Sequence, residues 1–298
     1  MRDAAQKLAE AKKTYRSDLT RPEHWAGFQP RTGDVLLVTP AKSGTTWTQS
    51  MIAMLLMGTA DLPDKLGTLS PWFDGGFGTL EDYQAALAGQ SGRRVIKSHT
   101  PALGIPVWEG VPVVTVFRHP LEVFLSIRKH LANARPIDAH PLLAPIDKAL
   151  PFFLDEPFDA EDIDKDCLAA IVTHFRELVL TTHVPQKLVL HYAGILADHA
   201  GTVAKLDAFL GTGASPELQA AITEATGFSA MKSRAAVFAP EANNDLWHDD
   251  QAFFAGGQSG HWRAEFTEAQ IAAYDAAFTR HLPNPAHRRW IETGYGDV

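Results

Sequence analysis

Apolar runs and segments with helical periodicity alternate along much of the chain. Four short runs rich in Val, Leu and Ile are typical of buried parallel strands, and they cover residues 35–39 (VLLVT), 95–98 (VIKS), 111–117 (VPVVTVF) and 187–192 (KLVLHY). Helix-like patterns lie between and after them, at residues 45–57, 121–131, 168–181, 195–210 and 217–225. The alternation predicts an α/β protein with an open parallel sheet and helices on both faces. Ligands of such sheets bind beyond the carboxyl ends of the strands.

Length and composition indicate how large the core can be and in which compartment the protein is expected. With 298 residues, 45% of them hydrophobic, the chain can bury a substantial core, and no linker, charge block or repeat divides it. We therefore expect one domain over residues 1–298. The net charge of −8 argues against a nucleic-acid-coating protein. The N-terminus lacks a signal-peptide pattern, no run is long enough to span a membrane, and Cys167 is the single cysteine, so we expect a cytoplasmic protein.

The stretch PAKSGTTW joins the first apolar run to the first helical segment. When a strand is followed by a tight turn and the beginning of a helix, several backbone N–H groups point at one position. Such a position suits an anion such as phosphate. Gly44 permits close approach of the backbone and Lys42 adds a charge. Hydroxyl donors are supplied by Ser43, Thr45 and Thr46. An ordinary capped helix start is the alternative; the ATP-binding pattern GxxxxGK[ST] is absent, because Lys42 precedes Gly44.

Two further strand ends carry polar side chains. In VFRHPLEVFLS, Arg118 at a strand end and Ser126 two turns into the next helix can converge on one phosphate, although such a pair can also be merely solvated. In VIKSHTP, His99 follows Lys97. A histidine titrates near neutrality and suits a general base, whereas a structural hydrogen bond is its commoner use. None of the 13 histidines shows a metal-binding spacing, so no metal is expected.

All three stretches resemble the cytosolic-type sulfotransferases. PAKSGTTW is similar to that family's loop for the 5′-phosphate end of 3′-phosphoadenosine 5′-phosphosulfate (PAPS), and VFRHPLEVFLS is similar to its strand, turn and helix for the 3′-phosphate. VIKSHTP resembles the strand end that supplies a lysine and the catalytic histidine. The resemblance implies a three-layer sandwich with a central parallel sheet, related to the P-loop NTPase fold, and PAPS as co-substrate without a metal.

The resemblance also implies catalytic roles. His99 would be the general base that takes the proton from an acceptor hydroxyl as its oxygen attacks sulfur. Lys42 would meet the negative charge that grows on the 5′-phosphate, and Lys97 would have a supporting role near the same oxygen and the attacking hydroxyl. Ser126 would restrain Lys42 until substrate arrives. Such transfer depends mainly on positioning and charge stabilisation.

Recognition of adenine is implied downstream of these motifs. Tyr192 matches the family's position near the base, and TGFSAMKS places Thr226, Phe228 and Met231 around it. Trp47 offers a stacking face beside the phosphate loop. Each of these side chains would equally suit the core.

The C-terminal stretch FFAGGQSGHWRAEFTEAQ resembles the family's lid but departs from it. Gly257, Gly260 and Trp262 match, whereas Ala255 and Gly256 replace the two basic residues that usually close over the 3′-phosphate. Losing charge-assisted hydrogen bonds of about 1.5 to 3 kcal/mol each would weaken cofactor binding unless other groups compensate. The candidates for compensation are Lys232, Arg234 and the backbone N–H groups of the lid glycines. The family's dimerisation pattern is mostly absent, so no oligomeric state is predicted.

The acceptor is less defined than the donor. GTLSPWFDGG is loosely similar to a bacterial branch of the family that acts on glycolipids, and residues 135–166 suggest a long surface loop or short helices at the acceptor entrance. Seven aromatic residues are available for an acceptor pocket: Trp72, Phe73, Phe77, Trp108, Phe152, Phe153 and Trp247. A phenol, an alcohol and a lipid-linked sugar all remain open as hydroxyl acceptors.

The sequence thus predicts a PAPS-dependent sulfotransferase. A protein of the same fold that binds PAPS or adenosine 3′,5′-bisphosphate (PAP) without transfer is the alternative, motivated by the altered lid. An ATP-dependent kinase is disfavoured by the missing P-loop pattern.

Overall fold

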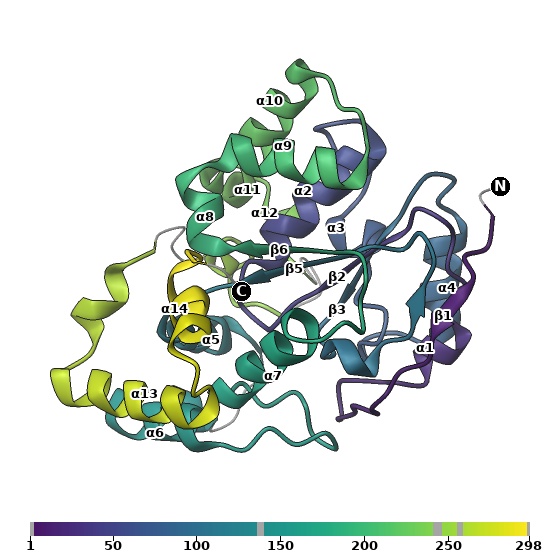
Figure 1. Ribbon diagram of the computed structural model, residues 1–298. Coiled ribbons are helices and arrows are strands. Elements are labelled where there is room, and N and C mark those ends of the chain that lie inside the picture. The colour runs from purple at the N-terminus through teal and green to yellow at the C-terminus, as the bar shows by residue number, and fades with distance from the viewer. Residues whose placement is uncertain (1–2, 136–139, 241–245, 255–258, 297–298) are drawn as a thin grey trace.

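The fold is built around a four-stranded parallel sheet. The computed structural model describes residues 3–135, 140–240, 246–254 and 259–296 (Figure 1). The strands are β2 (Val35–Val38), β3 (Val95–Ser98), β5 (Val113–Phe117) and β6 (Lys187–His191), in the order β3-β2-β5-β6. All three neighbouring pairs are parallel. The predicted parallel sheet is therefore confirmed.

Helices cover both faces of this sheet (Figure 1). They are α1 (His24–Gly27), α2 (Thr45–Met57), α3 (Leu66–Leu69), α4 (Leu80–Ala88), α5 (Pro120–Asn133), α6 (Ile146–Asp155), α7 (Leu168–Val179), α8 (Tyr192–Ala197), α9 (His199–Leu210), α10 (Pro216–Ala225), α11 (Phe228–Ser233), α12 (Ala235–Phe238), α13 (Glu268–His281) and α14 (Pro285–Thr293). A short antiparallel pair, β1 (Lys7–Ala9) and β4 (Val107–Trp108), lies outside the main sheet.

Side chains of the central strand β2 alternate between two cores because successive residues of a strand point to opposite faces. Val35 and Leu37 pack with residues of α2, α9 and α10, whereas Leu36 and Val38 pack with residues of α1, α4 and α7. All four are essentially inaccessible to solvent. The three layers expected from the resemblance follow from this two-sided burial.

One segment differs from the sequence prediction, and another takes one of its two predicted forms. The helix expected at residues 195–210 is divided into α8 and α9 at Asp198, whose carboxylate accepts a hydrogen bond from the Gly201 N–H and caps α9. Residues 135–166, for which a long surface loop or short helices are predicted, contain the short helix α6, whose Leu150 and Phe153 are buried in the core.

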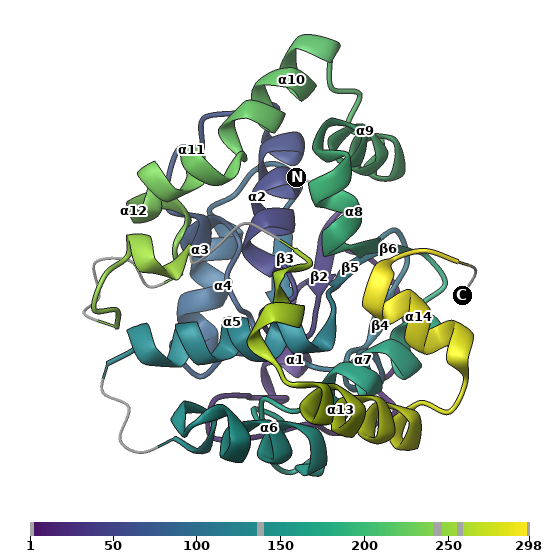
Figure 2. The same ribbon diagram turned by 90° about the vertical axis from the view of Figure 1, so that its left-hand side faces the viewer.

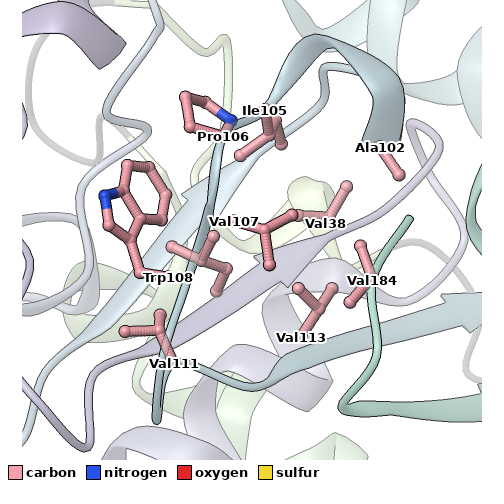
Figure 3. A pocket seen from close by; sticks show the side chains of 10 residues that line it. Val38, Ala102, Ile105, Pro106, Val107, Trp108, Val111, Val113 and Val184 are labelled. Carbon is pink, nitrogen blue, oxygen red and sulfur yellow. The ribbon is translucent and has the colours of Figure 1, made fainter. Parts of the chain in front are cut away.

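Two further observations concern the described residues. Among them, no helix is long and apolar enough to cross a membrane. A small void of about 10 Å³ next to β2 and β5 is lined by apolar and aromatic side chains such as Val38, Val113 and Val184 (Figure 3). This void is a packing defect without groups for chemistry.

Candidate active site

The turn between β2 and α2 has the strained geometry that a close backbone approach requires. Gly44 is the N-cap of α2 with φ of 113°, and Lys42, with φ of 57°, has the single positive φ among the described non-glycine residues. A Cβ on Gly44 would lie 2.9 Å from Cδ2 of Tyr192. Both the dihedral angle and the space therefore demand glycine at this position. Figure 2 shows α2 rising from this turn, with α5 running below it.

A cavity of about 750 Å³ opens beyond the carboxyl ends of the strands. It is lined by Pro40 after β2, His99 after β3, Arg118 after β5 and Tyr192 after β6. The cavity thus lies where parallel sheets bind their ligands.

Most residues predicted for the site meet in this cavity. The lining includes Lys42, Gly44, Thr45, Thr46, Trp47, Lys97, His99, Arg118, Ser126, Tyr192, Thr226, Phe228 and Met231. Ser43 does not line it, because its side chain is fully buried and its hydroxyl donates to the Ala41 carbonyl at 3.4 Å. Gly257 lies outside the described residues, as do Ala255 and Gly256.

His99 is oriented by the strand next to its own. Its Nδ1 lies 2.8 Å from the Thr39 carbonyl oxygen, which can only accept, so Nδ1 carries the proton and Nε2 keeps a lone pair. The ring also packs edge-on against Trp72, with centroids 5.0 Å apart. Burial and the nearby charge of Lys97 hold the pKa of His99 well below its usual value. The imidazole is therefore neutral at neutral pH, with a free lone pair on Nε2.

Lys42 points toward α5 and residues 251–253. Its Nζ lies 2.9 Å from Nδ1 of His130 and 4.4 Å from the ring centroid of Phe253. Burial, followed by the charge of Lys97, lowers the pKa of Lys42 to about 7. The residue is half-buried and lines the cavity.

Arg118 is fixed from two sides. Its Nε donates to Oε2 of Glu122 at 2.9 Å, and its guanidinium lies 4.2 Å from the ring centroid of Tyr192. Glu122 also accepts from the Ser259 hydroxyl at 2.7 Å and from the Gly260 N–H. Burial would raise the pKa of Glu122, but these hydrogen bonds and the charge of Arg118 lower it. The carboxylate therefore joins Arg118 to the described part of the lid.

The two basic residues suggested as substitutes for the lid charges lie elsewhere. Arg234 forms an ion pair with Asp61 at 2.7 Å, and neither Arg234 nor Lys232 lines the cavity.

An aromatic cluster forms part of the cavity wall, with Trp47 and Tyr192 in the lining. Trp47 contacts the rings of Tyr192 and His199, with centroids 5.5 and 5.0 Å apart, and its indole nitrogen has no hydrogen-bond partner among the described residues. The Thr226 hydroxyl donates to the Ile222 carbonyl at 2.7 Å and pairs with Nε2 of His199 at 3.0 Å. Trp47, Tyr192 and Thr226 line the cavity, and a planar heterocycle would suit an aromatic wall of this kind.

The aromatic residues expected to form an acceptor pocket divide into two groups. Trp72, Phe77 and Trp247 line the cavity. The others, Phe73, Trp108, Phe152 and Phe153, do not line it and pack in or against the core. A sequence pattern alone does not separate these two fates, because both use large apolar side chains.

Several residues of the site were not predicted from the sequence. His130 lies four residues after Ser126 on α5, a spacing that puts both on one helix face and could have indicated it. Asp166 lines the cavity, and burial raises the pKa of its carboxyl to about 7 although the charge of Lys42 opposes the rise. Asp74 accepts hydrogen bonds from Ser98 and Thr100, the neighbours of His99 in the chain, both at 2.7 Å.

Comparisons with solved structures support the fold. The mouse sulfotransferase SULT7A1 complexed with PAP superposes with a TM-score of 0.67 at 22% identity, covering 93% of this chain and 96% of that one. Retinol dehydratase in complex with androsterone and inactive cofactor PAP gives a TM-score of 0.68 at 19% identity, with 87% and 83% covered.

Comparisons of the sequence identify relatives. A glycolipid sulfotransferase of Mycobacterium bovis is 31% identical over 94% of each chain. Sulfotransferase 1A1 of Canis lupus familiaris is 26% identical over 86% of this chain and 85% of its own. The sequence pattern that defines the sulfotransferase domain family matches residues 32–284. The chain therefore belongs to this family.

Proposed function

We propose that this single-domain protein transfers the sulfuryl group of PAPS to a hydroxyl group of an acceptor. The observation that carries the proposal is the orientation of His99, whose Nδ1–H is committed to the Thr39 carbonyl while its unprotonated Nε2 keeps a lone pair for a proton. Two lysines, Lys42 and Lys97, line the same cavity. A neutral base beside two cationic groups is the arrangement that sulfuryl transfer to an alcohol requires.

The residues on the cavity wall fit the donor. Gly44, Thr45 and Thr46 at the start of α2 offer N–H and hydroxyl donors to the 5′-phosphate end. Arg118 and Ser126 would hold the 3′-phosphate. Adenine would lie at the aromatic cluster described above, near Trp47 and Tyr192, with Thr226, Phe228 and Met231 around it.

Each group has a defined task in the transfer. Nε2 of His99 would take the acceptor proton as the acceptor oxygen bonds to sulfur. The bond between sulfur and the 5′-phosphate oxygen breaks, and its electron pair stays on that oxygen. Lys42 and Lys97 would stabilise the resulting charge, so the protein contributes positioning and electrostatics rather than covalent chemistry.

The acceptor that best fits the wall is amphipathic. Trp72, Phe77 and Trp247 supply apolar surface, whereas Asp164 and Asp166 supply carboxyl groups that would accept hydrogen bonds from hydroxyls. The mycobacterial relatives carry the name glycolipid sulfotransferase. We therefore propose a lipid-linked sugar as the acceptor class, ahead of a simple phenol or alcohol.

Two measurements test the proposal. Calorimetric titration with PAP, AMP and ATP should show a clear preference for PAP, because Arg118 and Ser126 would contact the 3′-phosphate. Incubation with radiolabelled PAPS and a glycolipid extract should then yield a labelled lipid. PAP binding without transfer to any acceptor would favour the binding-protein alternative, and equal affinity for AMP and PAP would refute the donor assignment.

A further inference from the structure

Two carboxyl groups that follow each other closely in the chain line the cavity, and their surroundings differ. They belong to Asp164 and Asp166. Asp164 is bound to the N-terminal part of the chain, because its carboxylate accepts hydrogen bonds from the hydroxyl groups of Ser17 and Thr20. No described residue forms a hydrogen bond or an ion pair with the carboxyl group of Asp166. Asp166 is therefore the one of the two whose oxygen atoms are available to a ligand.

The free carboxyl group of Asp166 is half-buried. Burial raises its pKa to about 7, although the charge of Lys42 opposes the rise. In either protonation state an oxygen of the group can accept a hydrogen bond from a hydroxyl. A polar group that is shielded from water without a partner costs free energy, and a ligand hydroxyl that pairs with it on binding would offset this cost.

One face of α7 runs from Asp166 toward the transfer site. The residues of this face that line the cavity are Cys167, Ala170, Ile171 and His174. Nε2 of His174 lies 3.0 Å from the His99 carbonyl oxygen. Because α7 begins at Leu168, its first residue and His174 are about 9 Å apart along the helix axis. An acceptor that lies along this face can therefore present one hydroxyl to His99 and another to Asp166.

Electrostatics agree with this placement. Burial is the main influence on the pKa of both His99 and Asp166, and the charge of Lys42 acts on both as well. Both side chains thus lie within the electrostatic reach of one ammonium group. An alkyl chain on the acceptor has apolar surface next to His99, because Trp72 packs against the imidazole and Phe77 packs against Trp72. Phe77 lines the cavity and is 52% exposed, so this surface reaches solvent.

We propose that Asp166 is a specificity-determining residue, which accepts a hydrogen bond from a second hydroxyl of the acceptor while His99 takes the proton of the reacting one. This role rests on the proposed function of the cavity. It makes the enzyme favour a polyol headgroup, such as a sugar, over an alcohol with a single hydroxyl. Asp164 has no such role, since Ser17 and Thr20 already bind it.

The test compares two acceptors that share an alkyl chain. Octyl glucoside presents several hydroxyl groups and octanol presents one. The wild type should have the higher kcat/KM for octyl glucoside. Asp166→Ala removes both oxygen atoms and should lower the ratio of kcat/KM for octyl glucoside to that for octanol by about tenfold, because one hydrogen bond is lost. Asp166→Asn keeps one oxygen acceptor and should retain a ratio closer to wild type, and both variants should bind PAP as the wild type does.

Asp162→Ala is the matched control, since it removes the same charge from the same segment. Asp162 is exposed, does not line the cavity and pairs with Lys165 at 3.7 Å, so its loss should leave the ratio unchanged. A wild-type preference for octanol, an unchanged ratio in D166A, an equal fall for both acceptors or weaker PAP binding would each overturn the inference.

Failure of the wild type to use octyl glucoside would overturn the role of Asp166 too, provided that a labelled product forms with another acceptor. If no acceptor yields a labelled product, the proposed function itself fails.

Discussion

The substitution Gly44→Ala tests whether the turn after β2 is shaped for the donor. Gly44 has φ of 113° and ψ of 19°, a conformation that alanine disfavours by about 1 to 2 kcal/mol. The new methyl group would also lie 2.9 Å from Cδ2 of Tyr192, below the usual contact distance. The ring would have to move, and it lies against both Arg118 and Trp47.

The expected effect therefore has two parts. The backbone strain lowers the free energy of unfolding by about 1 to 2 kcal/mol. Displacement of Tyr192 weakens its contact with the Arg118 guanidinium and disturbs the donors at the start of α2. Loss of about 1.4 kcal/mol or more from these contacts would weaken PAP binding at least tenfold.

A matched control is present at the other end of the same helix. Gly58, the C-cap of α2, has φ of 67°, and a Cβ there would have no neighbour within 4 Å. Gly58→Ala should lower stability through backbone strain alone and leave PAP affinity unchanged. Thermal unfolding and calorimetric titration of both variants separate the two parts. Wild-type PAP affinity in G44A, or an equal loss in G58A, would refute the role of this turn.

Two further predictions concern pH and stability. Because the pKa of His99 lies below its ordinary value, the acid limb of the pH profile of kcat/KM for PAPS should lie below about pH 6.5. On the alkaline side, Lys42 loses its charge as pH rises through about 7, and kcat/KM should fall there. An acid limb at the ordinary histidine value would contradict the first of these expectations. Asp34→Asn leaves the buried Arg94 guanidinium, now 2.5 Å from the Asp34 carboxylate, without its charge partner and should cost about 3 to 5 kcal/mol in denaturant unfolding. The exposed ion pair of Asp155 is the control, since Asp155→Asn should cost less than about 1 kcal/mol.

The parts of the fold that local sequence determines were predicted well. Both β3 (Val95–Ser98) and α2 (Thr45–Met57) match the expected ranges, because the strand is a short apolar run and glycines cap the helix at both ends. The break at Asp198 was missed, since a capping aspartate inside a helical pattern resembles an exposed helical residue. The motifs likewise led to one cavity, because each of them follows a parallel strand.

Other features of the site depend on contacts between distant residues. The pairing of Lys42 with His130 joins positions 88 residues apart; the spacing after Ser126 could have indicated His130 as a site residue, but not its pairing with Lys42. The same holds for Glu122, which binds Arg118 at the start of its own helix and accepts from Gly260, 138 residues away in the chain. Whether an aromatic residue such as Phe73 or Trp72 is buried in the core or lines the cavity is likewise decided by tertiary packing.

The role of His99 is the central claim, and one measurement tests it most directly. His99→Asn retains a side-chain amide that can donate to the Thr39 carbonyl but has no basic nitrogen in place of Nε2. At saturating PAPS and acceptor, kcat should fall by roughly two to four orders of magnitude, while the dissociation constant of PAP stays near wild type. His174→Gln, which alters the neighbouring histidine that contacts the His99 carbonyl, should have a much smaller effect. Unchanged kcat in H99N, with PAP binding intact, would contradict the account.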